Sequence, residues 1–532
     1  MSVNRFPGTT VVERAFNASS PGRERRDAAG AFIGRSNQGP LEPTPVTSWA
    51  QFTSLFGTQY TELHNAVHDF YASGGRQAFI VRIPGVDGVA SSLDVFDAGQ
   101  ASPPVGSPTP LFTVTALNPG VWGDRLHLVV RTRDAANKRF DVALFNVPTG
   151  VTFDPSKTNS EYVVDRWSDV SLVPGDSRNL YDVANQPSTA GSPLVQFAGQ
   201  EYDATADPAT WLMPSTVPGG SQFDGGVDGS YGGAYSNETA YLAAMQLLDD
   251  VPGPLVLNAP GMHTAAIIRS LTEAAANRGD VFVVVDTAAN LAPSAAVTYA
   301  NTDLGLNALG VSVPSYAAVF YPWVYLPVVG STSSGRSTLR APGGSVVGAM
   351  LRTDSNIGPW RAPAGLEVGQ LGRAVATERQ LKSTDLAVLN DGNVNAIRNV
   401  TGAGVTIMGA RTMKRFGKDR YINVRRNVMH IGASVAALTE FAVFRNNDQR
   451  LWVQIEEQVA AFLGAVWQRG GLKGETANEA FFAKCDEENN SPASVDEGVV
   501  NIDIGVALLV PAEFINITIS QFEGGTNVTS GV

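Results

Sequence analysis

A pair of histidines is the first place to look for metal chemistry in this chain of 532 residues. His64 and His68 stand four residues apart in a segment with helical periodicity, so their imidazoles could share a metal ion. A zinc site needs further ligands, and neither Glu62 nor Asp69 clearly shares that helix face. We therefore expect ordinary helix-surface histidines and no metal site.

A carboxylate at a strand end is the second candidate for chemistry. Asp286 follows the apolar run VFVVV at 281–285, and open α/β sheets hold their active sites at the carboxyl ends of such strands. A hydrolase would also need a nucleophile, and the sequence has no GxSxG elbow. The Gly- and Asp-rich stretch at 224–236 matches neither a phosphate-binding loop nor a calcium loop. The residues thus predict no catalytic site and no cofactor, and they favour Asp286 as a turn cap.

Basic side chains gather at one place in an otherwise acidic chain. The chain has 38 Lys and Arg residues against 50 Asp and Glu residues, a formal charge of −12, which argues against direct nucleic-acid binding as its main role. The cluster is either a solvated face or a surface that registers an acidic partner. Its members fall within thirteen residues: Lys414, Arg415, Lys418, Arg420, Arg425 and Arg426.

The elements that must position these residues belong to a multidomain protein of the α/β and α+β classes. A chain of this length exceeds one hydrophobic core, and 54 Gly and 31 Pro residues indicate many turns. Cys485 is the single cysteine, so no intramolecular disulfide can form, which suits assembly in a reducing cytosol. Its apolar runs fall far short of the roughly 20 residues that span a bilayer, so we expect no membrane insertion.

Periodicity divides the chain into five segments. Strand and helix signals with tight links predict an α/β middle domain, in which the strand at 281–285 is buried on both faces. Regularly spaced short strands predict a β-sandwich inserted between its halves. Helices at about 421–444 and 448–469 predict an αβ C-terminal domain. The expected boundaries are an N-terminal arm at 1–25, the middle domain at 26–88 plus 216–385, the inserted domain at 89–215, the C-terminal domain at 386–510 and a terminal strand at 511–532.

The last strand signal has the features of an assembling segment. EFINITIS at 513–520 alternates apolar and polar residues and would form an exposed sheet edge if left unpaired. It either pairs within its own chain or reaches a neighbouring subunit, since eight extended residues span roughly 26 Å. GTTVVERA at 8–15 is a similar alternating segment in an otherwise polar N-terminal arm.

Two stretches of the last quarter have the most specific sequence pattern: the motif GVTIMGARTM at 404–413 and the run from Tyr421 to Phe514. Together with several earlier segments, taken in sequence order, they resemble the contractile tail sheath proteins of phages and phage-like injection machines, whereas residues 89–215 match only loosely. A minor departure is APGG at 341–344, where the family often has Pro-Pro-Ser-Gly. The other matching segments are FPGTTVVE, FIGRSNQGPLEPTPVTSWAQFTSLFG, AVHDFYASGGRQAFIVRI, ALNPGVWGDRL, YPWV and SNIGPWRAPAG.

The resemblance implies a structural subunit, not an enzyme, that polymerises as stacked hexameric rings around an inner tail tube. Contraction from a metastable extended state would drive the tube through a target cell envelope by rigid-body repacking of subunits. The implied partners are other copies of the chain, the inner tube protein, and the baseplate and tail terminator proteins. Assembly would occur in the bacterial cytoplasm and yield a virion tail or another contractile particle.

The resemblance also implies roles for particular segments. The inserted domain would lie outside and the C-terminal domain inside, with the basic cluster facing the tube. The two terminal strands would form an inter-subunit mesh. The mesh residues are Thr9, Thr10, Val11, Val12, Glu13, Phe514, Ile515, Asn516, Ile517, Thr518 and Ile519.

Two alternatives from other classes stay open at this point. One is an α/β hydrolase that uses Asp286, and the other is a non-contractile capsid or surface-layer component, which shares the assembly logic but not the GARTM segment at 409–413. The sequence does not distinguish a phage tail from a bacteriocin or another injection system, nor an extended from a contracted state.

Overall fold

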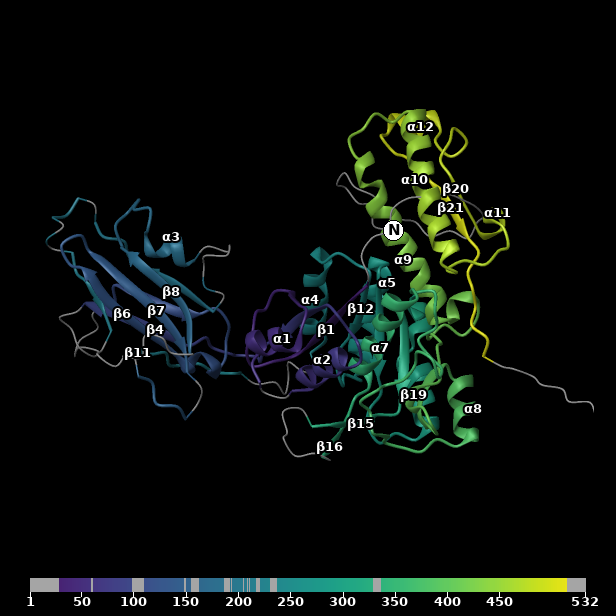
Figure 1. Cartoon of the computed structure of the whole chain (residues 1–532), viewed down its shortest axis with the longest axis horizontal. Helices are drawn as coiled ribbons and strands as arrows, with labels where there is room; N and C mark the ends of the chain where they lie inside the picture. Colours follow the sequence, from purple (N-terminus) through teal and green to yellow (C-terminus); the bar gives the residue numbers. More distant parts are fainter. Residues whose placement is uncertain are drawn as a thin grey trace, which may run out of the picture.

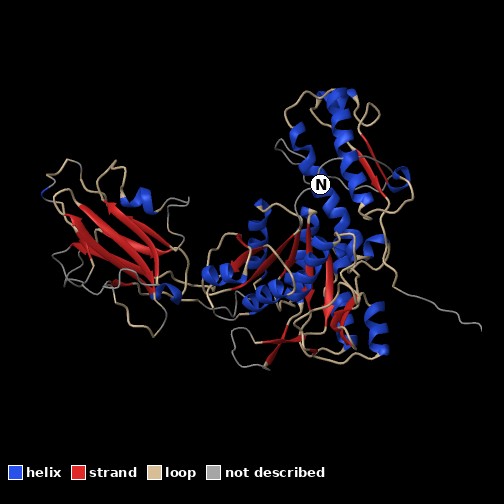
Figure 2. Ribbon diagram, viewed as in Figure 1, coloured by secondary structure: helices blue, strands red, loops and turns tan. Residues whose placement is uncertain are grey.

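Three parts make up the structure, which is a computed structural model (Figure 1). A central α/β domain carries an inserted β-sandwich on one side and a helical C-terminal part on the other (Figure 2). The α/β multidomain class predicted from the sequence is confirmed. The structure describes residues 28–58, 61–97, 110–147, 150–154, 162–185, 192, 194–203, 205–207, 209, 211–216, 221–229, 237–328 and 336–513.

An eight-stranded sheet forms the centre of the α/β domain. Its six inner strands run parallel, and its two edge strands pair antiparallel. Every residue of the predicted apolar strand is buried, because helices cover both faces of the sheet. In order across the sheet the strands are β19 (Gly404–Ile407), β18 (Val394–Val400), β14 (Ala317–Tyr321), β13 (Val281–Asp286), β12 (Leu255–Asn258), β1 (Ala29–Arg35), β3 (Ala78–Ile83) and β2 (Thr44–Val46).

The helices pack in two layers on this sheet. Helix α1 begins directly after Ser48, whose side chain caps it by accepting a hydrogen bond from the Gln51 N–H. Helices α2 and α7 approach so closely that a Cβ on Gly344 would lie 2.3 Å from the Ala66 carbonyl oxygen. One layer contains α4 (Glu238–Leu247), α5 (Ala265–Arg278), α6 (Pro293–Thr298) and α8 (Ser383–Asp391), and the other contains α1 (Trp49–Phe56), α2 (Glu62–Ala72) and α7 (Gly343–Asn356). A small sheet of β15 (Val324–Pro327), β16 (Ser337–Arg340) and β17 (Ala376–Thr377) lies beside them.

The inserted domain is the expected antiparallel sandwich, with the short helix α3 (Leu180–Ala184) at its side. Its core holds the fully buried rings of Phe112, Phe140 and Phe197. Pairing continues to the bridge between Val89 and Val227, so the predicted boundary at residue 215 is wrong. One sheet contains β10 (Pro214–Ser215), β4 (Ser92–Asp97), β5 (Phe112–Ala116) and β9 (Val195–Gly199), and the other β11 (Ser221–Gln222), β6 (Leu126–Asp134), β7 (Arg139–Asn146) and β8 (Val163–Val170).

The C-terminal part is built on the predicted helix pair, α9 (Ile422–Thr439) and α10 (Gln449–Gln468). It also contains α11 (Ala477–Ala480), β20 (Phe481–Lys484), α12 (Pro492–Asp496) and β21 (Asp503–Val506). Helix α10 packs through one apolar face, whose members recur at helical spacing and are all buried: Leu451, Ile455, Val459, Phe462, Leu463 and Val466. The predicted domain start at residue 386 is wrong, because β18 and β19 extend the central sheet. Among the described helices, none is long and apolar enough to cross a bilayer.

Candidate assembly surfaces

The basic cluster splits into a buried pair and an exposed loop. Arg425 and Arg426 lie in the first turns of α9 and are 2% and 5% exposed. Both η-nitrogens of Arg426 donate to the carboxylate of Asp354 in α7, one of them at 3.0 Å from Oδ1. The prediction that these two arginines face a partner is therefore wrong for the folded chain, because they join α9 to the α/β domain.

Arg425 joins the same helix to a second point of the α/β domain. Its guanidinium carbon lies 4.6 Å from the centre of the Tyr316 ring, a cation–π contact. Its Nη2 also lies 3.4 Å from Oδ2 of Asp419. Although burial alone would raise the pKa of Asp419, hydrogen bonds and charge from Lys414 and Arg425 hold it below its usual value.

The other four basic residues belong to a loop at 412–420 that precedes α9. Lys414 points back into the loop, with its Nζ 2.8 Å from Oδ2 of Asp419. Arg420 stacks on the ring of Tyr421 and donates to the Tyr421 hydroxyl at 2.6 Å. Arg415 and Lys418 are exposed. These two are the members of the predicted cluster that the fold presents most fully to solvent.

The predicted mesh residues, Thr9–Glu13 and Phe514–Ile519, lie outside the residues that the structure describes. Glu513, the last described residue, is held by Arg411 of the GARTM segment. Arg411 Nε donates to Glu513 Oε1 at 2.9 Å, its Nη2 donates to Oε2, and its Nη1 donates to the Asn390 carbonyl at 2.7 Å. The motif thus fixes the position of the last described residue, a role that residue types alone did not reveal.

Three of the matching segments meet at the joint between the sandwich and the α/β domain. Buried Arg82 donates to the carbonyls of Ser36, Gly39 and Pro119 at 2.6, 2.9 and 2.8 Å. Asp228, in the Gly-rich stretch, accepts from the Asn37 side chain at 2.8 Å and from the Val121 N–H at 3.0 Å. Hydrogen bonds among distant loops therefore fix the inserted domain, and the Gly-rich stretch takes part in holding it.

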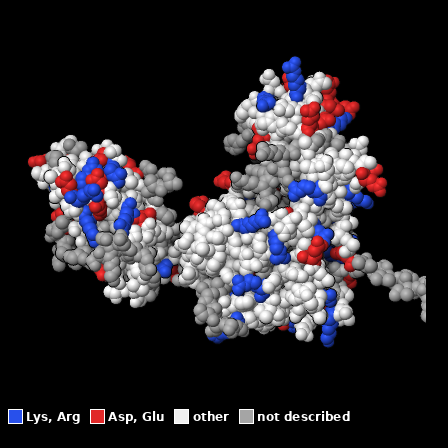
Figure 3. All heavy atoms as spheres, viewed as in Figure 1, with Lys and Arg blue, Asp and Glu red and all other residues white. Residues whose placement is uncertain are grey.

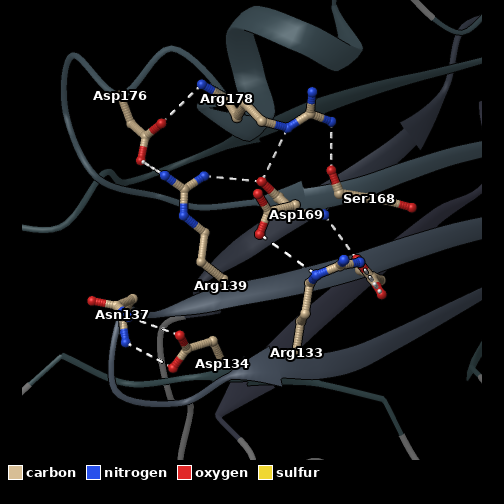
Figure 4. A network of polar contacts seen from close by, with 9 residues as sticks. Arg133, Asp134, Asn137, Arg139, Ser168, Asp169, Asp176 and Arg178 are labelled. Carbon is tan, nitrogen blue, oxygen red and sulfur yellow. Dashed lines mark hydrogen bonds and ion pairs between the residues drawn. The ribbon is translucent and has the colours of Figure 1, made fainter.

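The outer sheet of the sandwich carries a network of paired charges (Figure 4). Arg139 contacts Asp176 at 2.6 Å and donates to the Asp169 carbonyl at 2.9 Å. Arg133 lies 3.3 Å from Asp141 and 3.7 Å from Asp169, with about half of its side chain exposed. Exposed pairs of this kind add little stability, typically below about 1 kcal/mol. Because the charges of both signs alternate, this face has no large excess of one sign.

Asp286 has a structural role at the carboxyl ends of the strands. Its carboxylate accepts from the N–H of Gly343 at 2.8 Å, from the N–H of Gly261 at 3.1 Å and from Nδ2 of Asn258 at 3.1 Å. It therefore ties β12 and β13 to the start of α7, in agreement with the predicted cap. Complete burial raises the pKa of Asp286 to about 6 despite these hydrogen bonds. In the described ranges, no group of three or more His, Cys, Asp or Glu side chains could hold a metal ion.

The prediction of surface histidines is wrong for His64. Its ring is fully buried, with Nε2 3.0 Å from the Phe56 carbonyl and Nδ1 2.8 Å from the Thr61 hydroxyl. The carbonyl can only accept, so Nε2 carries a proton. The Thr61 hydroxyl also donates to the Arg35 carbonyl at 2.8 Å, so its one proton has two acceptors within reach. Burial lowers the pKa of His64 to about 4, even though the backbone carbonyls of Phe56 and Gly57 favour the charged form.

Replacing His64 with Gln should remove a pH dependence of stability. Since the pKa falls from 6.5 unfolded to about 4 folded, the wild-type chain should lose about 3 kcal/mol of unfolding free energy between pH 6.5 and 4 through this group. Asp286 acts in the opposite direction, because its raised pKa favours the protonated folded state as the pH falls below about 6. Urea unfolding across this pH range, compared between wild type and His64→Gln, isolates the histidine.

Asn65→Gln, one residue further along α2, is the control, because it changes no titratable group. Its pH profile should follow that of the wild type. A His64→Gln profile parallel to the wild-type profile from pH 6.5 to 4 would contradict the prediction.

Part of the chain is similar in sequence to known phage proteins. Residues 418–522 match the family model of the phage tail sheath C-terminal domain. A tail sheath protein of Vibrio phage KVP40 is 25% identical over 181 residues, which cover 34% of this chain and 26% of that protein. The match therefore spans about a quarter of the length of that curated relative.

Solved structures share the fold over nearly the whole chain. The helical sheath of the anti-feeding prophage in its contracted state has a TM-score of 0.55 at 18% identity, covering 98% of this chain and 100% of that chain. The sheath tail protein of Listeria innocua has a TM-score of 0.58 at 11% identity, covering 91% and 96%. The predicted resemblance to contractile tail sheath proteins is confirmed, and these relatives are structural proteins, not enzymes.

Proposed function

We propose that this chain is the structural subunit of a contractile tail sheath, polymerising as stacked hexameric rings around an inner tail tube. The observation that supports this most directly is a fold likeness to a contracted sheath that runs through all three parts of the chain. A likeness confined to the α/β domain would fit many unrelated functions. Here it extends through the inserted sandwich and the helical C-terminal part, which also matches the sheath domain model.

The partners follow from this proposal. Other copies of the chain form the rings, a baseplate starts them, a tail terminator ends them and the tube fills them. One chain of the anti-feeding prophage baseplate structure has a similar fold over 98% of this chain, and this similarity supports the baseplate contact. The assembly would form in a bacterial cytoplasm, and contraction would be a repacking of rigid subunits that needs no bound nucleotide.

Segment roles are proposed as follows. The terminal strands at 9–13 and 514–519 form the inter-subunit mesh, and the exposed members of the basic loop face the tube. The Arg411–Glu513 ion pair supports the first role, because it anchors the residue that directly precedes the proposed last strand. Exposed Arg415 and Lys418 support the second, since a charged rim steers and registers a complementary partner.

The hydrolase alternative rests on Asp286, whose carboxylate is committed to the amides of Asn258, Gly261 and Gly343. The non-contractile alternative is disfavoured by the likeness to contracted sheaths. No observation favours either alternative over the sheath proposal.

Electron microscopy of the purified chain tests the proposal. Alone or with its inner-tube subunit, the protein should form tubular polymers with a regular axial repeat and six-fold end views. A chain that stays monomeric at high concentration, both alone and with the tube subunit, would overturn the proposal, as would flat sheets or closed shells.

A further inference from the structure

The loop at 412–420 displays a phenylalanine to solvent. Phe416 is 79% exposed and stands between exposed Arg415 and, across Gly417, exposed Lys418. A phenyl ring left in water forgoes the favourable free energy of burial, about 1.5–3 kcal/mol. Aromatic side chains, phenylalanine among them, and arginine are also enriched at protein interfaces relative to the rest of the surface.

The base of this loop is fixed by hydrogen bonds. The Thr412 N–H donates to the Arg420 carbonyl and the Thr412 hydroxyl donates to the Asp419 carbonyl, both at 2.8 Å. The Met413 N–H donates to Ala317 at the start of β14, at 2.9 Å. Lys414 and Arg425 both reach the Asp419 carboxylate. The tip is thus held in one shape before any partner arrives, which lowers the ordering cost of binding.

We propose that Phe416 is the anchor of a preformed docking tip, and that the tip binds the inner-tube subunit at an apolar pocket rimmed by carboxylates. The proposal rests on the sheath function proposed above and deepens it, by naming the residue and the partner chemistry of the tube contact. Arg415 and Lys418 flank the ring, so a partner that buries the ring must meet two positive charges at its rim.

A second copy of the chain is the competing occupant. One cavity in the described part of the chain lies between the sheet and α9, with room for about one water, and its lining includes Arg426 with its partner Asp354, together with Arg469 and His430. That cavity is too small for a phenyl ring. Acidic side chains do gather near α12 (Figure 3), among them Glu487, Glu488, Asp496 and Glu497, so the experiment must separate the two occupants.

The test compares Phe416→Ala and the double variant Arg415→Glu/Lys418→Glu with a matched control, Phe444→Ala. Phe444 is 89% exposed and lies in the turn after α9, away from the loop. Each full-length variant is assayed for binding to purified inner-tube subunit by sedimentation, and for polymerisation without tube by electron microscopy. Lys414 is left intact, because reversing its charge would break the Asp419 contact at the base of the loop.

Phe416→Ala should weaken tube binding on the order of 30-fold, and the double variant should weaken it most at low salt. Self-polymerisation and thermal stability should match the wild type in both, and Phe444→Ala should bind normally. Wild-type tube affinity in Phe416→Ala would overturn the proposal. Loss of self-polymerisation without tube would assign the tip to a second copy and overturn it as well. Failure of the wild-type chain to polymerise, both alone and with the tube subunit, would overturn the sheath function, which is a different result.

Discussion

Removal of residues 514–532 should abolish polymerisation and leave a folded monomer. The segment at 513–520 alternates apolar and polar residues, and strand addition to a neighbour's sheet would supply a row of main-chain hydrogen bonds at every contact in the lattice. Because every subunit of a polymer makes the same contacts, the loss of one contact weakens the attachment of every subunit, and growth of the polymer stops. The truncated chain keeps Glu513 and therefore the ion pair to Arg411. Light scattering and electron microscopy at matched concentration measure the outcome.

Two further truncations sharpen this test. Removal of residues 1–20 deletes the proposed N-terminal partner of the mesh and should give the same monomer. Removal of residues 512–532 also deletes Glu513, and the resulting chain should assemble no better than the chain that lacks 514–532. Normal sheaths from any of these chains would refute the mesh. A truncated chain that unfolds or aggregates would instead assign the last strand to the fold of its own chain.

The sequence was most informative where structure depends on near neighbours. The strand at 281–285 could be recognised because every residue is apolar, and α10 because six apolar residues recur on one helical face. The N-cap Ser48 could be recognised for the same reason, since a cap bonds three residues ahead. Such features need no knowledge of distant contacts.

Domain boundaries could not be predicted, because they depend on pairing between distant residues. Strand β11 has two residues, too few to show alternation, and it joins the sandwich only by pairing with β6. Strand β18 belongs to the central sheet because it pairs with β14, whose partner residues lie 75 positions earlier in the chain. Both predicted boundaries failed at such strands.

The basic cluster shows the same limit at the level of side chains. Six cations close in sequence are not one surface, since α9 turns Arg425 and Arg426 inward while the preceding loop turns Arg415 outward. The residues that bury the two arginines, Asp354 and Tyr316, stand 72 and 109 positions away in the chain. His64 was misjudged for the same reason, because the carbonyl that receives its proton belongs to the end of another helix.

Polar side chains help to join the start of α9 to its surroundings. Asn423 donates to the carbonyls of Trp360 and Leu509, each at 3.0 Å, and Asn427 donates to Gly471 at 3.0 Å. Arg426 and Asp354 lie among these contacts and are both nearly inaccessible to water. Directional bonds of this kind set the angle of the helix more narrowly than apolar packing alone, so the C-terminal part should move together with the α/β domain.

Replacing Arg426 with Met should therefore cost about 3–5 kcal/mol of unfolding free energy, because Asp354 would remain as an uncompensated buried charge. Urea unfolding followed by the fluorescence of Trp360 and the other tryptophans measures the loss.

The double variant Arg426→Met/Asp354→Leu should recover much of this loss, since replacing a whole buried pair with apolar groups is often nearly neutral. Arg415→Met, a change in the exposed loop, should stay within about 0.5 kcal/mol of wild type. A loss below about 1 kcal/mol for Arg426→Met would show that water reaches this pair. The double variant separates two roles of the pair: if it is stable but assembles poorly, the ion pair matters for the fixed angle between the two parts and not for folding itself.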